Sequence, residues 1–163
     1  MAVGVFGLQV AYKLKRTELL SLEDTHGWFG GGMTPGTAVS SVDRIDFSND
    51  TSTSTPRGAL SVARRSLTAT GNSNFGWFGG GWFTPSTPQI NYSTIDRINF
   101  YNDSVTTLAR GPLASTRYSL GSTANSNYGW FGGGQLFDPV TPANTRKTSV
   151  DRIDFSNDSP TAS

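Results

Sequence analysis

Apolar and polar residues alternate over short segments of this chain, and the alternation predicts β-strands. In one such segment, Ile45 and Phe47 would point to one side of an extended strand. Val42, Arg44 and Asp46 would point to the other side. Both sides of this strand therefore carry residues that need partners.

One unit of the chain contains four segments of this kind, separated by turns. Gly, Asn, Asp and Ser favour turns, and Pro is tolerated only at the edge of a sheet because it lacks a backbone N–H. The predicted strands, from inner to outer, are 62–70, 75–79, 41–47 and 51–55, with turns at 71–74 and 48–50 and with Pro56 closing the unit.

Two motifs occur three times each, so the chain consists of three imperfect copies of one unit. The string G-W-F-G-G-G occurs at 27–32, 76–81 and 129–134. It is followed by V-D-R-I-D-F-S-N-D, or a close variant, at 42–50, 95–103 and 150–158. Arg57 and Arg110 each begin an Arg-Gly-x-Leu element. The predicted organisation is an N-terminal segment 1–26, with the hypothesis that it supplies a degenerate first strand, followed by repeats 27–75, 76–128 and an incomplete 129–163.

The composition fits a β-rich protein and excludes several kinds of site. Charged residues make up 15% and aromatic residues 12%, so the chain has large apolar side chains to bury. The net charge is +1 without a basic cluster, and we expect no nucleic-acid partner. The absence of cysteine excludes disulfides and thiolate metal sites. No apolar run approaches the ~18 residues of a membrane-spanning helix, so we expect no membrane span.

The order of these motifs resembles the kelch repeat, which runs to about 50 residues. An aromatic strand ends in glycines, a V-x-x-Φ-D-x strand follows, and an Arg-containing stretch leads into the next aromatic strand. The resemblance covers about residues 27–163 and is nearest to kelch-like tandem arrays of marine phages and bacteria. It departs from the family in its glycine triplet and in lacking a Trp after the D-R-I motif. The resemblance implies an all-β fold of four-stranded antiparallel blades, about three of them, as a partial propeller or an assembled β-repeat array.

Both faces of a propeller blade are covered by neighbouring blades, so the polar positions of the third strand need an explanation. An Arg recurs there with an acidic or amide residue two positions later. We interpret the pairs as a buried structural ladder in which each Arg bonds carboxylates or carbonyls of the adjoining blade. The pairs are Arg44 with Asp46, Arg97 with Asn99, and Arg152 with Asp154.

Catalytic interpretations are weaker than structural ones. An arginine cluster could bind a substrate carboxylate, as in sialidases, but one Arg per repeat would be spread around a ring rather than converge. A copper-radical oxidase on a kelch scaffold would need Cys and several His, and the chain has His26 alone. The glycine triplets lack the Lys-Ser/Thr of a P-loop and are better explained by close packing of strand backbones. We therefore expect a non-enzymatic protein with no catalytic residue, metal or cofactor.

Four N-x-S/T sequences would be candidate glycosylation sites in a secreted eukaryotic protein. The simpler interpretation is that Asn-Asp is a favoured turn pair between two strands. The four asparagines are Asn49, Asn91, Asn102 and Asn157.

The segment between each glycine triplet and the D-R-I motif varies in length and sequence, whereas its flanks are nearly constant. Binding residues commonly lie in loops on a rigid scaffold, and aromatic anchors suit protein or glycan partners. The alternative is that these tips pack on a neighbouring blade or subunit, and both interpretations remain open. The candidate residues are Met33, Trp82, Phe83, Ile90, Tyr92, Leu136, Phe137 and Val140.

Three repeats are fewer than the four to eight blades of a propeller. The chain is therefore expected to be part of a longer array, to join a second copy in a ring, or to pair head to tail in a filament. The functional hypothesis is a self-associating structural or binding protein of a phage virion appendage or an extracellular filament. The alternative is an adaptor that binds a protein or glycan partner through its variable loops.

Overall fold

The computed structural model describes residues 25–49, 51, 53–84, 89–138, 140 and 143–163. This part of the chain is all-β, with one 3₁₀ turn, η2 (Phe100–Asn102), and no α-helix. The predicted degenerate strand within 1–26 lies outside the described residues except for its last two positions. No helix in the described part is long and apolar enough to cross a membrane.

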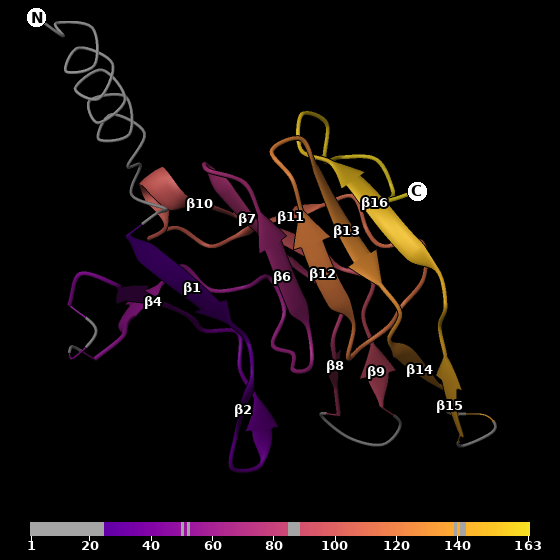
Figure 1. Cartoon of the computed structure of the whole chain (residues 1–163). Helices are drawn as coiled ribbons and strands as arrows, with labels where there is room; N and C mark the ends of the chain where they lie inside the picture. Colours follow the sequence, from indigo (N-terminus) through magenta and orange to yellow (C-terminus); the bar gives the residue numbers. More distant parts are fainter. Residues whose placement is uncertain (1–24, 50, 52, 85–88, 139, 141–142) are drawn as a thin grey trace, which may run out of the picture.

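Three antiparallel sheets lie side by side along the chain (Figure 1). In the first sheet the order is β1 (His26–Gly30), β4 (Val42–Asp46) and β5 (Thr55–Arg57). In the second it is β11 (Leu108–Arg110), β10 (Ile95–Asn99), β7 (Phe75–Gly79) and β6 (Thr68–Gly71). In the third it is β12 (Gly121–Ala124), β13 (Tyr128–Gly132) and β16 (Val150–Asp154).

The same register joins the two motif strands in every sheet. The Trp of the G-W-F-G strand lies opposite the Arg of the D-R-I strand in all three sheets, as in the pair Trp77 and Arg97. Paired residues of an antiparallel sheet share one face, so each Trp and each Arg lie side by side on the same face. The sequence repeat is therefore also a structural repeat.

The variable segments form two-stranded hairpins rather than irregular loops. They project from the same end of the three sheets in Figure 1. The hairpins are β2 (Met33–Thr34) with β3 (Thr37–Ala38), β8 (Trp82–Phe83) with β9 (Ile90–Asn91), and β14 (Gln135–Asp138) with β15 (Ala143–Arg146).

Two predicted strand boundaries are wrong. The inner strand, expected at 62–70, is confined to Thr68–Gly71, because the preceding segment is bonded to the first sheet's hairpin region instead. The Arg64 N–H donates to Val39 O at 3.2 Å, and Arg64 O accepts from Gly32 N at 3.0 Å. The outer strand, expected at 51–55, is Thr55–Arg57 and contains Pro56, which an edge strand tolerates.

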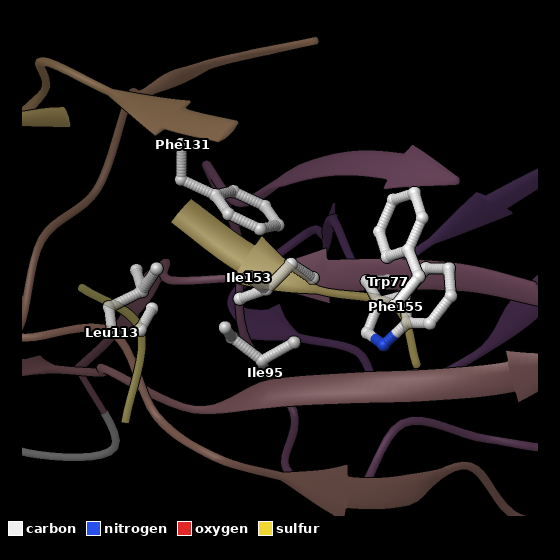
Figure 2. Close-up of a cluster of buried hydrophobic side chains, with 7 residues drawn as sticks. Trp77, Ile95, Leu113, Phe131, Ile153 and Phe155 are labelled. Carbon is white, nitrogen blue, oxygen red and sulfur yellow. The ribbon is translucent and has the colours of Figure 1, made fainter. Parts of the chain in front are cut away.

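The core lies between the sheets, in two clusters that we call junctions. The first junction, between the first and second sheets, consists of Val42, Leu60, Phe78 and Ile98. The second junction, between the second and third sheets, consists of Trp77, Ile95, Leu113, Phe131, Ile153, Phe155 and Ala162. Figure 2 shows Trp77 and Phe155 side by side in the second junction, with ring centroids 4.0 Å apart. Trp28 and Phe100 stack at the same distance in the first.

Close packing explains the first glycine of each internal triplet. A Cβ placed on Gly30 would lie 2.8 Å from the Phe78 ring, and one on Gly79 would lie 2.7 Å from the Phe131 ring. The aromatic ring of the next sheet therefore occupies the space where a side chain would be. The second glycine has a further reason, since Gly31 has φ +70°, a conformation that other residues rarely adopt.

We expect Gly79→Ala to lower the free energy of unfolding by about 1–3 kcal/mol, because the added methyl group overpacks the Phe131 ring. Chemical denaturation of the purified variant measures this change. The matched control is Gly121→Ala, since Gly121 also lies in a strand, β12, and a Cβ there would meet nothing within 4 Å. Equal stability of the two variants would contradict the role of Gly79 in the junction.

Candidate functional site

At the first junction, a carboxylate that follows β10 of the second sheet contacts three side chains of the first sheet. Asp103 Oδ2 accepts from Trp28 Nε1 at 2.9 Å and from Arg44 Nη1 at 3.1 Å. Arg57 Nε lies 3.3 Å from the same oxygen. Asp103 is buried, so this cluster is a shielded polar contact between two sheets.

The second junction repeats the arrangement. Asp158 Oδ2 accepts from Trp77 Nε1 at 2.8 Å and from Arg97 Nη1 at 3.2 Å, and Arg110 Nε lies 3.4 Å away. The arginines of the predicted ladder at these two junctions therefore bond a carboxylate of the adjoining sheet. The partner comes from the Asn-Asp step after the D-R-I strand.

The acidic and amide members of the predicted ladder have another role, which corrects that part of the hypothesis. They sit at the ends of their strands and form local turns instead of pairing with the arginines. Asp46 Oδ1 accepts from the backbone N and the hydroxyl of Ser48 at 2.8 and 2.6 Å. Asp154 does the same with Ser156, and Asn99 Oδ1 accepts from Tyr101 N at 3.0 Å. At the end of the strand, the side-chain oxygen lies within hydrogen-bond distance of the backbone N–H two residues later, the local bond that Asp and Asn commonly form in turns.

The hydrogen bonds of these turns shift the titration of the two carboxyls. The hydroxyl of Ser48 and then its backbone N–H lower the pKa of Asp46 below its ordinary value of 3.8. The same two groups of Ser156 lower the pKa of Asp154. Both donors stabilise the ionised form of the carboxyl, so the bonds strengthen when it is deprotonated.

Two deeply buried ion pairs were not predicted from the sequence. Arg64 and Asp96, both 0% exposed, form a 2.9 Å contact, and the Arg64 Nε also donates to Gly80 O at 2.8 Å. Arg117 and Asp151 form the equivalent pair at 2.9 Å in the third sheet. The sequence does contain a spacing that could have indicated these two arginines, because each stands twelve residues before a Gly-Trp pair (64 to 76, 117 to 129).

These pairs hold the connections between repeats. Asp96 Oδ2 also accepts from Ser61 N at 3.1 Å, and Arg64 Nη2 donates to Phe78 O at 3.1 Å. The segment that enters each inner strand is thereby fixed to the motif strands of its own sheet. Their position inside the fold gives them a structural role rather than access to a ligand.

The candidate binding residues lie on or beside the hairpins. Three of them, Met33, Ile90 and Val140, are exposed by 57%, 43% and 85%. The other five are half-buried: Trp82, Phe83, Tyr92, Leu136 and Phe137.

The hairpins also contact the connecting segments and, in one case, each other. The Arg65 guanidinium, in the segment before β6, lies 3.7 Å from the centre of the Trp82 ring. The Tyr118 ring, in the segment before β12, lies 5.7 Å from the Trp82 ring. Asn91 Nδ2 donates to Phe137 O at 2.9 Å between the second and third hairpins. The structure thus brings the hairpins into one row, with part of the aromatic surface used for packing and part left exposed.

The asparagines of the N-x-S/T sequences lie in two kinds of environment. Asn49 and Asn157 are exposed turn residues whose N–H groups donate back to Asp46 O and Asp154 O. Asn102 is exposed in η2. Asn91 is half-buried and uses its amide to join two hairpins. Within the described residues, no group of three or more His, Asp or Glu side chains is placed to hold a metal ion.

We expect Arg64→Gln to lower the free energy of unfolding by about 3–5 kcal/mol, because it leaves Asp96 buried without its partner. Arg146→Gln is the control, since Arg146 is exposed on β15 and a surface substitution changes stability by about 0.5 kcal/mol or less. Denaturant unfolding of both variants checks this expectation, and similar values would contradict it.

The lowered pKa values predict a pH dependence. The ionised turn carboxyls should stabilise the wild-type chain, relative to the double variant Asp46→Asn, Asp154→Asn, at pH values above 3.8. That advantage should disappear as the pH falls through the lowered folded-state pKa, because the carboxyls are then protonated in the folded and in the unfolded chain alike. Unfolding midpoints measured from pH 2 to 7 would reveal it, and an advantage that persists at the acid end would contradict it.

Comparison with known proteins gives a structural likeness only. No family model matches the sequence, and a comparison with curated proteins finds no significant match. The solved structure of YjhT is similar, with a TM-score of 0.69 at 15% identity over 85% of this chain. The chain spans 42% of that structure's length. At this identity the likeness concerns the fold alone.

Proposed function

We propose that this chain is a non-enzymatic structural and binding protein that works by self-association. In this proposal its three sheets are blades of a kelch-like propeller segment, and its two end faces bind further copies of the unit. The assembly would be a ring or a filament, as in a virion appendage or an extracellular fibre.

The observation that carries the proposal is a contrast between internal and terminal positions of the repeat. Phe78 and Phe131 are 3% and 0% exposed at the two junctions, but their counterpart Phe29, on the outer face of the first sheet, is 62% exposed. Val42 is 0% exposed, whereas its counterpart Val150, on the outer face of the third sheet, is 57% exposed. The same side chains that form the core inside the chain thus form two apolar faces at its ends.

Apolar faces of this kind favour association. Monomeric soluble proteins rarely expose contiguous apolar patches larger than a few hundred Å², and larger patches mark interaction sites. Phe47 adds to the face of the first sheet at 56% exposure, while its counterpart Phe155 is 9% exposed. The two faces are complementary: the outer face of the first sheet has the side chains with which later sheets contact the sheet before them, and the outer face of the third sheet has those with which earlier sheets contact the sheet after them.

The kelch-like propeller assignment has its own support. The second sheet contains all four antiparallel strands of one unit in the order β11-β10-β7-β6. The first and third sheets have three strands each, and three sheets are fewer than the four to eight blades that close a propeller. In the proposal, further copies supply the other blades.

A second candidate function is an adaptor that binds a protein or glycan partner through the hairpins. The contact between Met33, Arg65 and Trp82 favours this function, because the three residues combine an exposed thioether, a cation and an aromatic ring on one surface. Arginine and aromatic residues are enriched among the residues that dominate binding energy. This function would not require self-association.

Light scattering of the purified chain, with negative-stain images, tests the proposed function. We expect a mass of two or more copies, and a ring-like or fibrous outline. The double variant Phe29→Ser, Val150→Ser should reduce the mass toward one copy without loss of fold, because both side chains are exposed and support no internal contact of the core.

Val140→Ser is the matched control, since Val140 is 85% exposed and lies in the hairpin between β14 and β15 rather than on one of the paired motif strands. It should leave the mass unchanged. A folded wild-type monomer at high concentration would overturn self-association and leave the adaptor function.

A further inference from the structure

We infer that copies of this chain join head to tail through one defined contact, in which Phe29 of one copy packs onto Gly132 of the next. This inference rests on the proposed self-association and specifies its interface. The partner is a second copy of this chain, bound in the register of the internal junctions.

The two internal junctions supply the template. At each junction, a Phe of the following sheet occupies the space beside the first glycine of the preceding sheet's triplet, which is also the last residue of its G-W-F-G strand. The Phe78 ring lies over Gly30 and the Phe131 ring over Gly79, at distances that leave no room for a Cβ. The contact has therefore been built twice from residues in the same positions of the repeat.

The third copy of this contact is half present at each end of the chain. Gly132 corresponds to Gly30 and Gly79, but a Cβ there would meet only Val150 of its own sheet, at 3.4 Å. Phe29 corresponds to the two buried rings and is 62% exposed. Among the described residues, the first sheet thus has the ring without its glycine, and the third sheet has the glycine without its ring.

The polar half of the junction is also present on the face of the third sheet. Trp130 lies opposite Arg152 in the register that places Trp28 beside Arg44. Arg152 is exposed, and its guanidinium lies 4.8 Å from the centre of the Tyr128 ring. No carboxylate among the described residues lies within ion-pair distance of Arg152, whereas Arg44 and Arg97 each have one.

The two outer faces carry different groups. The face of the third sheet has the glycine backbone, an indole and a guanidinium, and the face of the first sheet has a phenylalanine ring. The two surfaces differ, so the contact is heterologous, and its repetition gives a ring or an open filament rather than a symmetric pair.

Mixing two complementary variants tests this contact. Phe29→Ala removes the ring and leaves the glycine, whereas Gly132→Val fills the space beside the glycine backbone and leaves the ring. Each variant alone should show a dissociation constant raised by more than about tenfold, because truncating or blocking a central aromatic anchor has that effect. A 1:1 mixture should form a dimer with one copy of each, since a single intact contact remains between them.

Light scattering and analytical ultracentrifugation of the single variants, the mixture and the wild type provide the readout. Circular dichroism and denaturation confirm that each variant is folded. Tyr101→Ala is the control for Phe29→Ala, because Tyr101 is also 62% exposed but lies in η2, and it should assemble like the wild type.

The outcomes separate this contact from self-association itself. A wild-type chain that stays monomeric overturns the proposed function and the contact with it. A wild type that associates while Gly132→Val associates equally well overturns the contact alone. A mixture that yields no dimer also overturns it, whereas a one-to-one dimer from two impaired variants supports it.

Discussion

Neighbouring sheets of this protein bury apolar faces against each other, and at both junctions a phenylalanine ring packed on a glycine backbone sets how close the two sheets can come. Phe78 and Phe131 fill the spaces left by Gly30 and Gly79, and the stacked Trp–Phe pairs follow from the same approach. A larger residue at either glycine would hold the sheets apart and leave the surrounding side chains without close contacts. The rest of the core depends on this one spacing.

The polar groups of the junctions are compatible with that spacing because every buried charged side chain among the described residues has an opposite partner. Asp103 and Asp158 each lie between an indole N–H and two guanidinium groups of the preceding sheet. Buried ion pairs add less to stability than their number suggests, but breaking one leaves an uncompensated charge. They therefore favour one register between the sheets over others in which the carboxylate and the arginines would be separated.

The repeat makes the molecule quasi-one-dimensional, and this organisation relates its stability to its proposed role. Each sheet contacts its neighbours in the chain, and the sheets at the two ends retain faces built like internal ones. The hairpins project from this stack and vary in length while the junctions stay constant. A scaffold of this kind can extend by adding units and can still present a variable surface along one side.

The sequence by itself determined the three-fold repeat, the all-β class and the position of the motif strand Phe75–Gly79, because those features depend on local alternation and on motif spacing. It also indicated that the glycines serve backbone packing and that the arginines contact the adjoining sheet. Only the tertiary structure decided that Asp103 and Asp158, rather than Asp46 and Asp154, are the partners, since a strand's alternation says which side a residue faces but not what lies there. The buried pair Arg64–Asp96 and the shortened inner strand depend on the same cause: they arise where a connecting segment crosses onto another sheet, and such long-range contacts leave no periodic signal in the chain.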